Sequence, residues 1–262
     1  MSAAGARGYA PRALAIPALI GLAFLILPLA ALVARVDWST FIADVTSEAA
    51  RSALLLSLGT GLVATLLCIA IGVPLALTIA RSGPRLAAVL RAAVTIPLVL
   101  PPMVGGIALL YLFGRAGWLG GLGLSFSTTA VILAQTFVAL PFLVLAVEGA
   151  VRTSGVEYER TAAALGAGRW TILRRITLPL AAPGIVAGLV LCFARAIGEF
   201  GATALFAGNR PGVTQTMPLA IYTAFNGAGV TQGAAVALAL LLLATAILVL
   251  LLVRGWRPGA AR

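Results

Sequence analysis

Long uninterrupted apolar stretches constrain the fold of this chain more than any other feature. A helix that crosses the hydrocarbon core of a bilayer needs about 20 mostly apolar residues, and several stretches meet that requirement. They run approximately over Ala13–Ala34, Ser52–Ala80, Ala92–Phe113, Thr128–Ala150, Pro183–Phe206 and Gln232–Val253. Backbone groups in lipid must be hydrogen-bonded within each span, so we expect an all-α membrane protein with six transmembrane helices. Since no repeat, linker or soluble segment divides the sequence, residues 1–262 are predicted to form one transmembrane domain.

The distribution of arginine predicts the orientation of these spans. Hydrophobic residues make up 61% of the chain and charged residues 10%, and all 18 basic residues are arginines. If the N- and C-termini are both cytoplasmic, the arginines expected outside are only Arg35, Arg51, Arg115 and Arg210. That distribution satisfies the positive-inside rule. The net charge of +11 is therefore assigned to topology in the lipid bilayer, and no nucleic-acid partner is expected.

The residues that are absent narrow the function. A phosphate-binding P-loop needs a lysine after its glycines, and the chain has no lysine. It also has no histidine and no GxSxG motif, so we expect no catalytic residues, no metal site and no cofactor. An ion-coupled secondary transporter would need acids within the membrane, where only Glu199 is clearly placed, with Glu148 near a span end. These absences favour energy supplied by another subunit.

One polar interruption, Glu159–Pro179, separates two apolar runs and reads ERTAAALGAGRWTILRRITLP. Its alanine-rich beginning favours a helix, and Gly166 can adopt the left-handed conformation that ends one. Trp170–Thr177 is predicted to form a second short helix that ends near Pro179. The pattern thus predicts a basic helix-turn-helix that docks on a partner protein. The alternative is an interfacial loop whose arginines contact phospholipid.

The same segment resembles the coupling loop of binding-protein-dependent ABC import permeases. That pattern is Glu-Ala-Ala, three residues, Gly, nine residues, then Ile-x-Leu-Pro, and this chain matches it from the glycine onward. At the glutamate end, Arg160 and Thr161 replace the first two residues, and Glu159 stands one position early. The resemblance implies a cytoplasmic coupling loop over about residues 151–180, with candidate coupling residues Glu159, Ala162, Gly166, Ile176, Leu178 and Pro179.

A second resemblance concerns the expected cargo. The stretches ARAIGEFGATALFAGN (Ala194–Asn209) and PGVTQTMPLAIYTAF (Pro211–Phe225) resemble molybdate permease subunits, which have sulfate and thiosulfate permeases as near relatives. The resemblance implies a type I ABC importer permease fold in the bacterial inner membrane. It also implies a homodimer with two copies of a separate ATPase subunit and a periplasmic oxyanion-binding protein. Such a subunit imports molybdate, or tungstate, by alternating access and is not itself an enzyme; a sulfate or thiosulfate permease is the alternative.

Arg195 and Glu199 are the candidate residues of a translocation pathway or gate. If the fifth span begins at Pro183, both lie at membrane depth, and their spacing of four residues places them on one helix face. One interpretation is that Arg195 attracts an oxyanion and the pair changes partners as a gate moves. The other is a fixed ion pair inside the helix bundle.

Three further features carry predictions. The proline cluster of Ile96–Pro102 predicts a break in the third span. Gly184 and Gly188 permit close helix packing, either within the chain or at a dimer seam. The segment Gly208–Gly229 is expected to be an external loop that meets a binding protein or hydrates an anion through Asn209, Thr214, Gln215 and Thr216.

Overall fold

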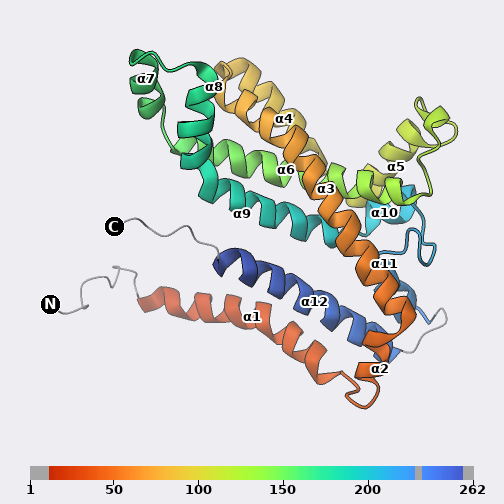
Figure 1. The fold of residues 1–262 in the computed structure, drawn as a ribbon. Coiled ribbons are helices and arrows are strands. Elements are labelled where there is room, and N and C mark those ends of the chain that lie inside the picture. The colour runs from red at the N-terminus through yellow and green to blue at the C-terminus, as the bar shows by residue number, and fades with distance from the viewer. Residues whose placement is uncertain (1–11, 228–231, 256–262) are drawn as a thin grey trace.

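The computed structural model describes residues 12–227 and 232–255, and within that part of the chain the secondary structure is entirely helical (Figure 1). Three short 3₁₀ or π segments accompany the α-helices: η1 (Arg12–Leu14), η2 (Gly120–Leu122) and η3 (Leu173–Thr177). The α-helices are α1 (Ala15–Ala34), α2 (Phe41–Thr46), α3 (Glu48–Arg81), α4 (Pro84–Val99), α5 (Pro102–Phe113), α6 (Thr128–Thr153), α7 (Glu157–Ala164), α8 (Arg169–Ile172), α9 (Leu178–Ile197), α10 (Gly201–Phe206), α11 (Met217–Phe225) and α12 (Gln232–Gly255). The all-α prediction is confirmed for these residues.

The helices account for the predicted spans in different ways. Helices α1, α3, α6 and the continuous run Arg169–Ile197 are each long and apolar enough to cross a membrane. Helices α4 and α5 meet that condition only together, and α12 is apolar over Gly233–Leu248. The count of six spans therefore stays a prediction. The start of α1 and the end of α12 lie on the same side of the bundle as α7 and α8 (Figure 1). The termini themselves, which are predicted to be cytoplasmic, fall in residues 1–11 and 256–262, outside the described residues.

Helices α3, α6 and α9 pack together as the core of the bundle, and small residues bring them close. A Cβ atom on Gly72 of α3 would lie 2.8 Å from a methyl carbon of Leu140 in α6, and one on Gly188 of α9 would lie 2.8 Å from Cβ of Ala146. Gly184 meets Ala150 in the same way. Close van der Waals packing of this kind holds membrane helices together because lipid provides no hydrophobic driving force between them. Gly184 and Gly188 thus pack against α6 of the same chain.

Two helix breaks lie side by side in this bundle. The predicted break in the third span is confirmed: α4 and α5 are separated at Leu100 and Pro101 and bent by 110°. The fifth span was predicted to be continuous to Phe206, which is wrong, because α9 ends at Ile197 and α10 begins at Gly201. Helices α5 and α10 then pack backbone to backbone, and a Cβ atom on Gly106 would lie 2.8 Å from Cα of Ala202.

The predicted start of the fifth span is also wrong. The second short helix does not end near Pro179, and the span does not begin at Pro183. Instead, α8 continues through the π-helical turn η3 into α9 as one helical run. Pro179 cannot donate a backbone hydrogen bond within this run, and the π-helical turn η3 ends two residues before it. The second half of the polar segment, from Arg169 onward, is therefore a continuous helical extension of a spanning helix.

Candidate functional site

The turn between α7 and α8 has the hydrogen bonds of a Schellman motif. The N–H of Ala167 donates to the carbonyl of Ala162, and the N–H of Gly166 donates to the carbonyl of Ala163, both at 3.0 Å. Gly166 has a φ of +84°, in the left-handed region that residues with a Cβ avoid. The helix-turn-helix prediction is correct for α7 and this turn, and Gly166 holds the position that the sequence assigns to it.

The outer surface of this hairpin exposes large apolar side chains among arginines. Leu165 is 84% exposed and Trp170 is 63% exposed. The guanidinium of Arg174 lies over the Trp170 ring, 4.7 Å from its centroid, and so orients that ring. Aromatic and arginine side chains are the groups that most often anchor protein interfaces. This surface has the composition of a docking site.

A groove on the same hairpin brings together several of the predicted coupling residues. It lies between α7 and the beginning of α9, and its lining residues are Tyr158, Thr161, Ala162, Leu165, Arg175, Ile176, Pro179 and Leu180. Ala162, Ile176 and Pro179 therefore share one groove, while Gly166 lies at the turn. Leu178 starts α9 and is half-buried outside the groove lining.

Glu159 faces the opposite way and ties the hairpin to two other elements. Its carboxylate forms an ion pair with Arg81 at the end of α3. Its Oε1 also accepts a hydrogen bond from the hydroxyl of Thr177 in η3, at 2.7 Å. The sequence did not identify Arg81 or Thr177, because the ion pair joins residues 78 positions apart. Glu159 thus connects α7, α3 and the helical run that leads into α9.

Arg195 and Glu199 form an ion pair next to the break between α9 and α10. Nη2 of Arg195 lies 2.7 Å from Oε2 of Glu199, although the N–H is not aligned with that oxygen well enough for a hydrogen bond. The other carboxylate oxygen accepts a hydrogen bond from the N–H of Ala202 in the first turn of α10, at 2.8 Å. Glu199 is fully buried, and the side chain of Arg195 is 25% exposed. These contacts therefore join the end of α9 to the first turn of α10. A continuous helix was expected at this position.

Other buried polar atoms in this region have no hydrogen-bond partner. They are the side-chain amide of Gln135 in α6 and the hydroxyls of Thr203 in α10 and Thr216. Buried polar groups without partners are rare in folded proteins. Sequence reasoning missed Gln135 and Thr203, since a single polar residue in an apolar run gives no signal of which way it faces.

The predicted external loop Gly208–Gly229 differs from expectation. It contains α11, whose first residue, Met217, donates its N–H to the Ser57 hydroxyl oxygen of α3 at 2.7 Å. As a result, Thr214, Gln215 and Thr216 are buried and only Asn209 among the four proposed donors is exposed. The expectation that these three meet a binding protein is therefore wrong. In residues 12–227 and 232–255, no group of three His, Cys, Asp or Glu side chains is arranged to hold a metal ion.

A bundle of broken apolar helices with a basic helical hairpin beyond its apolar spans is typical of a membrane transport subunit. The chain belongs to the family of the binding-protein-dependent transport system inner membrane component, whose pattern matches residues 72–259. It is therefore an inner-membrane protein and a permease component of an ABC transporter. It is 52% identical over 255 residues to the molybdenum transport system permease protein ModB of Mycobacterium tuberculosis, covering 95% of each chain. It is also 41% identical over 190 residues to ModB of Escherichia coli K12, covering 70% of this chain and 83% of that one.

Two solved structures with a similar fold are ABC transporters. A bacterial transporter of the acidic polysaccharide alginate gives a TM-score of 0.70 at 19% identity and covers 93% of each chain. The inward-facing MetNI methionine transporter gives a TM-score of 0.64 at 21% identity, covering 80% of this chain and 99% of that one. At these identities the likeness concerns the fold alone, which is that of a type I ABC importer permease.

Proposed function

We propose that this chain is the permease subunit of an ATP-driven ABC importer that carries molybdate, or tungstate, into the cytoplasm by alternating access. The observation that carries this proposal is the 52% identity to molybdenum permeases over 95% of both chains. The subunit works as a homodimer, with two copies of a separate ATPase subunit and a periplasmic oxyanion-binding protein. Both termini are cytoplasmic, and residues 1–262 act as one transmembrane domain.

In this proposal the hairpin of residues 151–180 receives movement from the ATPase. The exposed surface around Leu165 and Trp170 docks on that partner, with Ala162, Gly166, Ile176 and Pro179 shaping the contact, and Leu178 joining it to α9. Two connections carry the movement inward. The first is the unbroken helical run from α8 into α9, and the second is the contact of Glu159 with α3 and η3.

At the far end of α9, the proposal assigns the gate to Arg195 and Glu199. Arg195 lies about 24 Å along the helix from Pro179, at a rise of 1.5 Å per residue. A movement of α9 against α10 would change the contact between these two side chains, which releases a guanidinium able to pair with a passing oxyanion. During each cycle, Arg195 would then exchange the carboxylate of Glu199 for the passing oxyanion.

Uptake by the reconstituted complex tests the cargo. Proteoliposomes that contain the permease, the ATPase and the binding protein should show saturable, ATP-dependent uptake of radiolabelled molybdate that excess sulfate barely reduces. If sulfate competes equally at equal concentration, the subunit is a sulfate or thiosulfate permease instead. Uptake by the permease alone under a proton gradient would establish an ion-coupled carrier and overturn the proposal.

The charge-neutral double variant R195Q/E199Q tests the gate. Substituting Arg195 alone leaves a buried carboxylate without its counter-ion, a defect that costs about 3–5 kcal/mol, so the single variant confounds folding with transport. The double variant removes both charges at similar volume and is expected to assemble with the ATPase while losing most uptake. If the double variant assembles with the ATPase and takes up molybdate as fast as the wild type, Arg195 and Glu199 do not form the gate and have no role in transport.

A further inference from the structure

A cavity with a strongly basic lining lies at the end of the bundle near the coupling hairpin. It is bordered by the turn between α3 and α4 and by the last turns of α6, and its volume is about 370 Å³. Arg81 of α3, Arg91 of α4 and Arg152 of α6 all line it, together with Ser82 and the first turn of α4. None of its lining residues is acidic. We refer to it as the α3–α4–α6 cavity.

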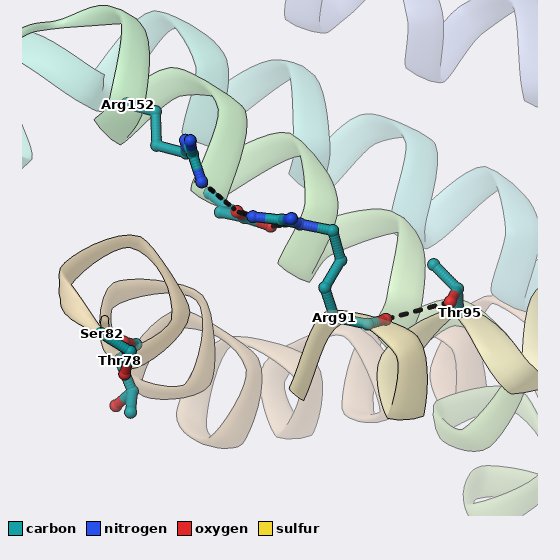
Figure 2. Close-up of polar contacts among 6 residues, drawn as sticks. Thr78, Ser82, Arg91, Thr95 and Arg152 are labelled. Atoms are coloured by element: carbon teal, nitrogen blue, oxygen red, sulfur yellow. Dashed lines mark hydrogen bonds and ion pairs between the residues drawn. The ribbon is translucent and has the colours of Figure 1, made fainter. Parts of the chain in front are cut away.

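Two of these arginines share one carboxylate that lies behind the lining. Nε of Arg91 is 3.2 Å from each oxygen of Glu148, and Nη2 of Arg91 also contacts Oε1. Nη1 of Arg152 reaches the same oxygen at 3.4 Å. Figure 2 shows the side chains of Arg91 and Arg152 extending toward each other from α4 and α6. The Glu148 side chain is only 5% exposed, so a buried single negative charge is matched by two guanidinium groups.

The cavity therefore keeps an excess of positive charge and of hydrogen-bond donors. Arg81 is paired with Glu159, so the three arginines meet only two carboxylates. A guanidinium carries five N–H donors, and the one long contact of Arg152 leaves most of its donors unused. Its side chain is 56% exposed and is thus accessible to a ligand. The positively polarised start of α4, which has no side-chain cap, adds to the same field.

Membrane topology alone does not account for this arrangement. The positive-inside rule explains why arginines gather at one end of the spans, but it does not require side chains from three helices to converge on one cavity. Convergent arginines with planar donor forks suit an oxyanion with several oxygens, and basic pockets between membrane helices bind lipid headgroups. We propose that the α3–α4–α6 cavity binds a phosphate-type oxyanion, supplied either by the headgroup of an anionic phospholipid or by a free anion. The proposal does not rest on the transport function proposed above, although Arg81 also forms the ion pair that joins Glu159 to α3.

The variant R152Q tests the site with little risk to the fold. Arg152 is mostly exposed, and Glu148 keeps its closer partner Arg91 when Arg152 is replaced. R85Q is the matched control, because Arg85 lies in the first turn of α4 yet does not line the cavity. Losing one charged hydrogen-bonding group should weaken binding by roughly tenfold in R152Q and leave R85Q close to wild type.

Binding is measured on the purified full-length chain in two arms. Native mass spectrometry compares retention of phosphatidylglycerol with that of phosphatidylethanolamine, and thermal shift at constant ionic strength follows added inorganic phosphate. A selective loss of phosphatidylglycerol in R152Q identifies a lipid headgroup, and a selective loss of the phosphate shift identifies a free anion. Either result supports the site. Equal losses in R152Q and R85Q, no loss in R152Q, or no anion preference in the wild type would overturn it.

Discussion

Substitution of Gly166 separates the shape of the coupling turn from the size of its side chain. Gly166 has a φ of +84°, so alanine is strained there whatever the space around it. A Cβ built at this position meets no atom within 4 Å, which means that a side chain causes no clash inside this chain. Asparagine tolerates the left-handed region better than alanine, and valine tolerates it least. The series G166N, G166A and G166V therefore increases backbone strain in steps that do not follow side-chain volume.

The backbone strain at residue 166 sets how far each variant lowers the population of the capped turn. A left-handed conformation costs an alanine about 1–2 kcal/mol, which lowers the population of the capped turn by a factor of about 5–30. The cost for G166N should be smaller and that for G166V larger. Gly168 provides the control, because its φ of −68° and ψ of 153° are open to alanine and its Cβ would also meet nothing. G168A should therefore behave much like the wild type.

Two assays read this series. Amide hydrogen exchange at Ala167, whose N–H closes the turn on Ala162, reports the population of the capped turn. Affinity for the ATPase in nanodiscs reports docking and should fall in the order G166N, G166A, G166V. If G166N lowers ATPase affinity as much as G166V does while amide exchange at Ala167 stays slow in G166N, side-chain size at the contact with the ATPase determines the loss and the strain argument is wrong. Normal docking by all three variants would remove the turn from the coupling role.

Two further predictions concern contacts between helices. A double-mutant cycle on E159Q and R81Q, measured by unfolding of the purified protein, should give a coupling energy of about 0.5–1 kcal/mol. The value is small because both side chains are partly exposed. If the two substitutions have additive effects, the ion pair does not join α7 to α3. G106A places a Cβ against the backbone of Ala202 and should destabilise the protein by about 1–3 kcal/mol. The control G121A should not, because a Cβ on Gly121 meets no atom within 4 Å. Equal melting temperatures for the two variants would contradict the close packing of α5 and α10.

The features that the sequence predicted correctly depend on local chemistry. Apolar length is needed to cross a bilayer, so the stretches that became α1, α3 and α6 are visible without any tertiary contact. Two adjacent prolines disfavour a continuous helix, because each lacks an N–H and Pro102 biases Pro101 away from the helical region, and a break does separate α4 from α5. The left-handed turn at Gly166 follows equally from one residue type and its neighbours. Pro179 suggested a helix end, but a proline can also lie within a helical run, and here the π-helical turn η3 connects α8 to α9 across that region.

The remaining features depend on which helix faces meet. Spanning helices are apolar on nearly every side, so their periodicity does not say which face is buried. The sequence therefore gave no sign that Glu159 pairs with Arg81, or that Glu148 pairs with Arg91, 57 positions away. It also could not show that α11 folds back onto α3 and buries Thr214–Thr216. The amino-acid sequence by itself determined the long apolar helices and the left-handed turn at Gly166. Only the tertiary structure decided which charges connect that turn to the bundle, because ion pairs between helices form where packing brings distant residues together.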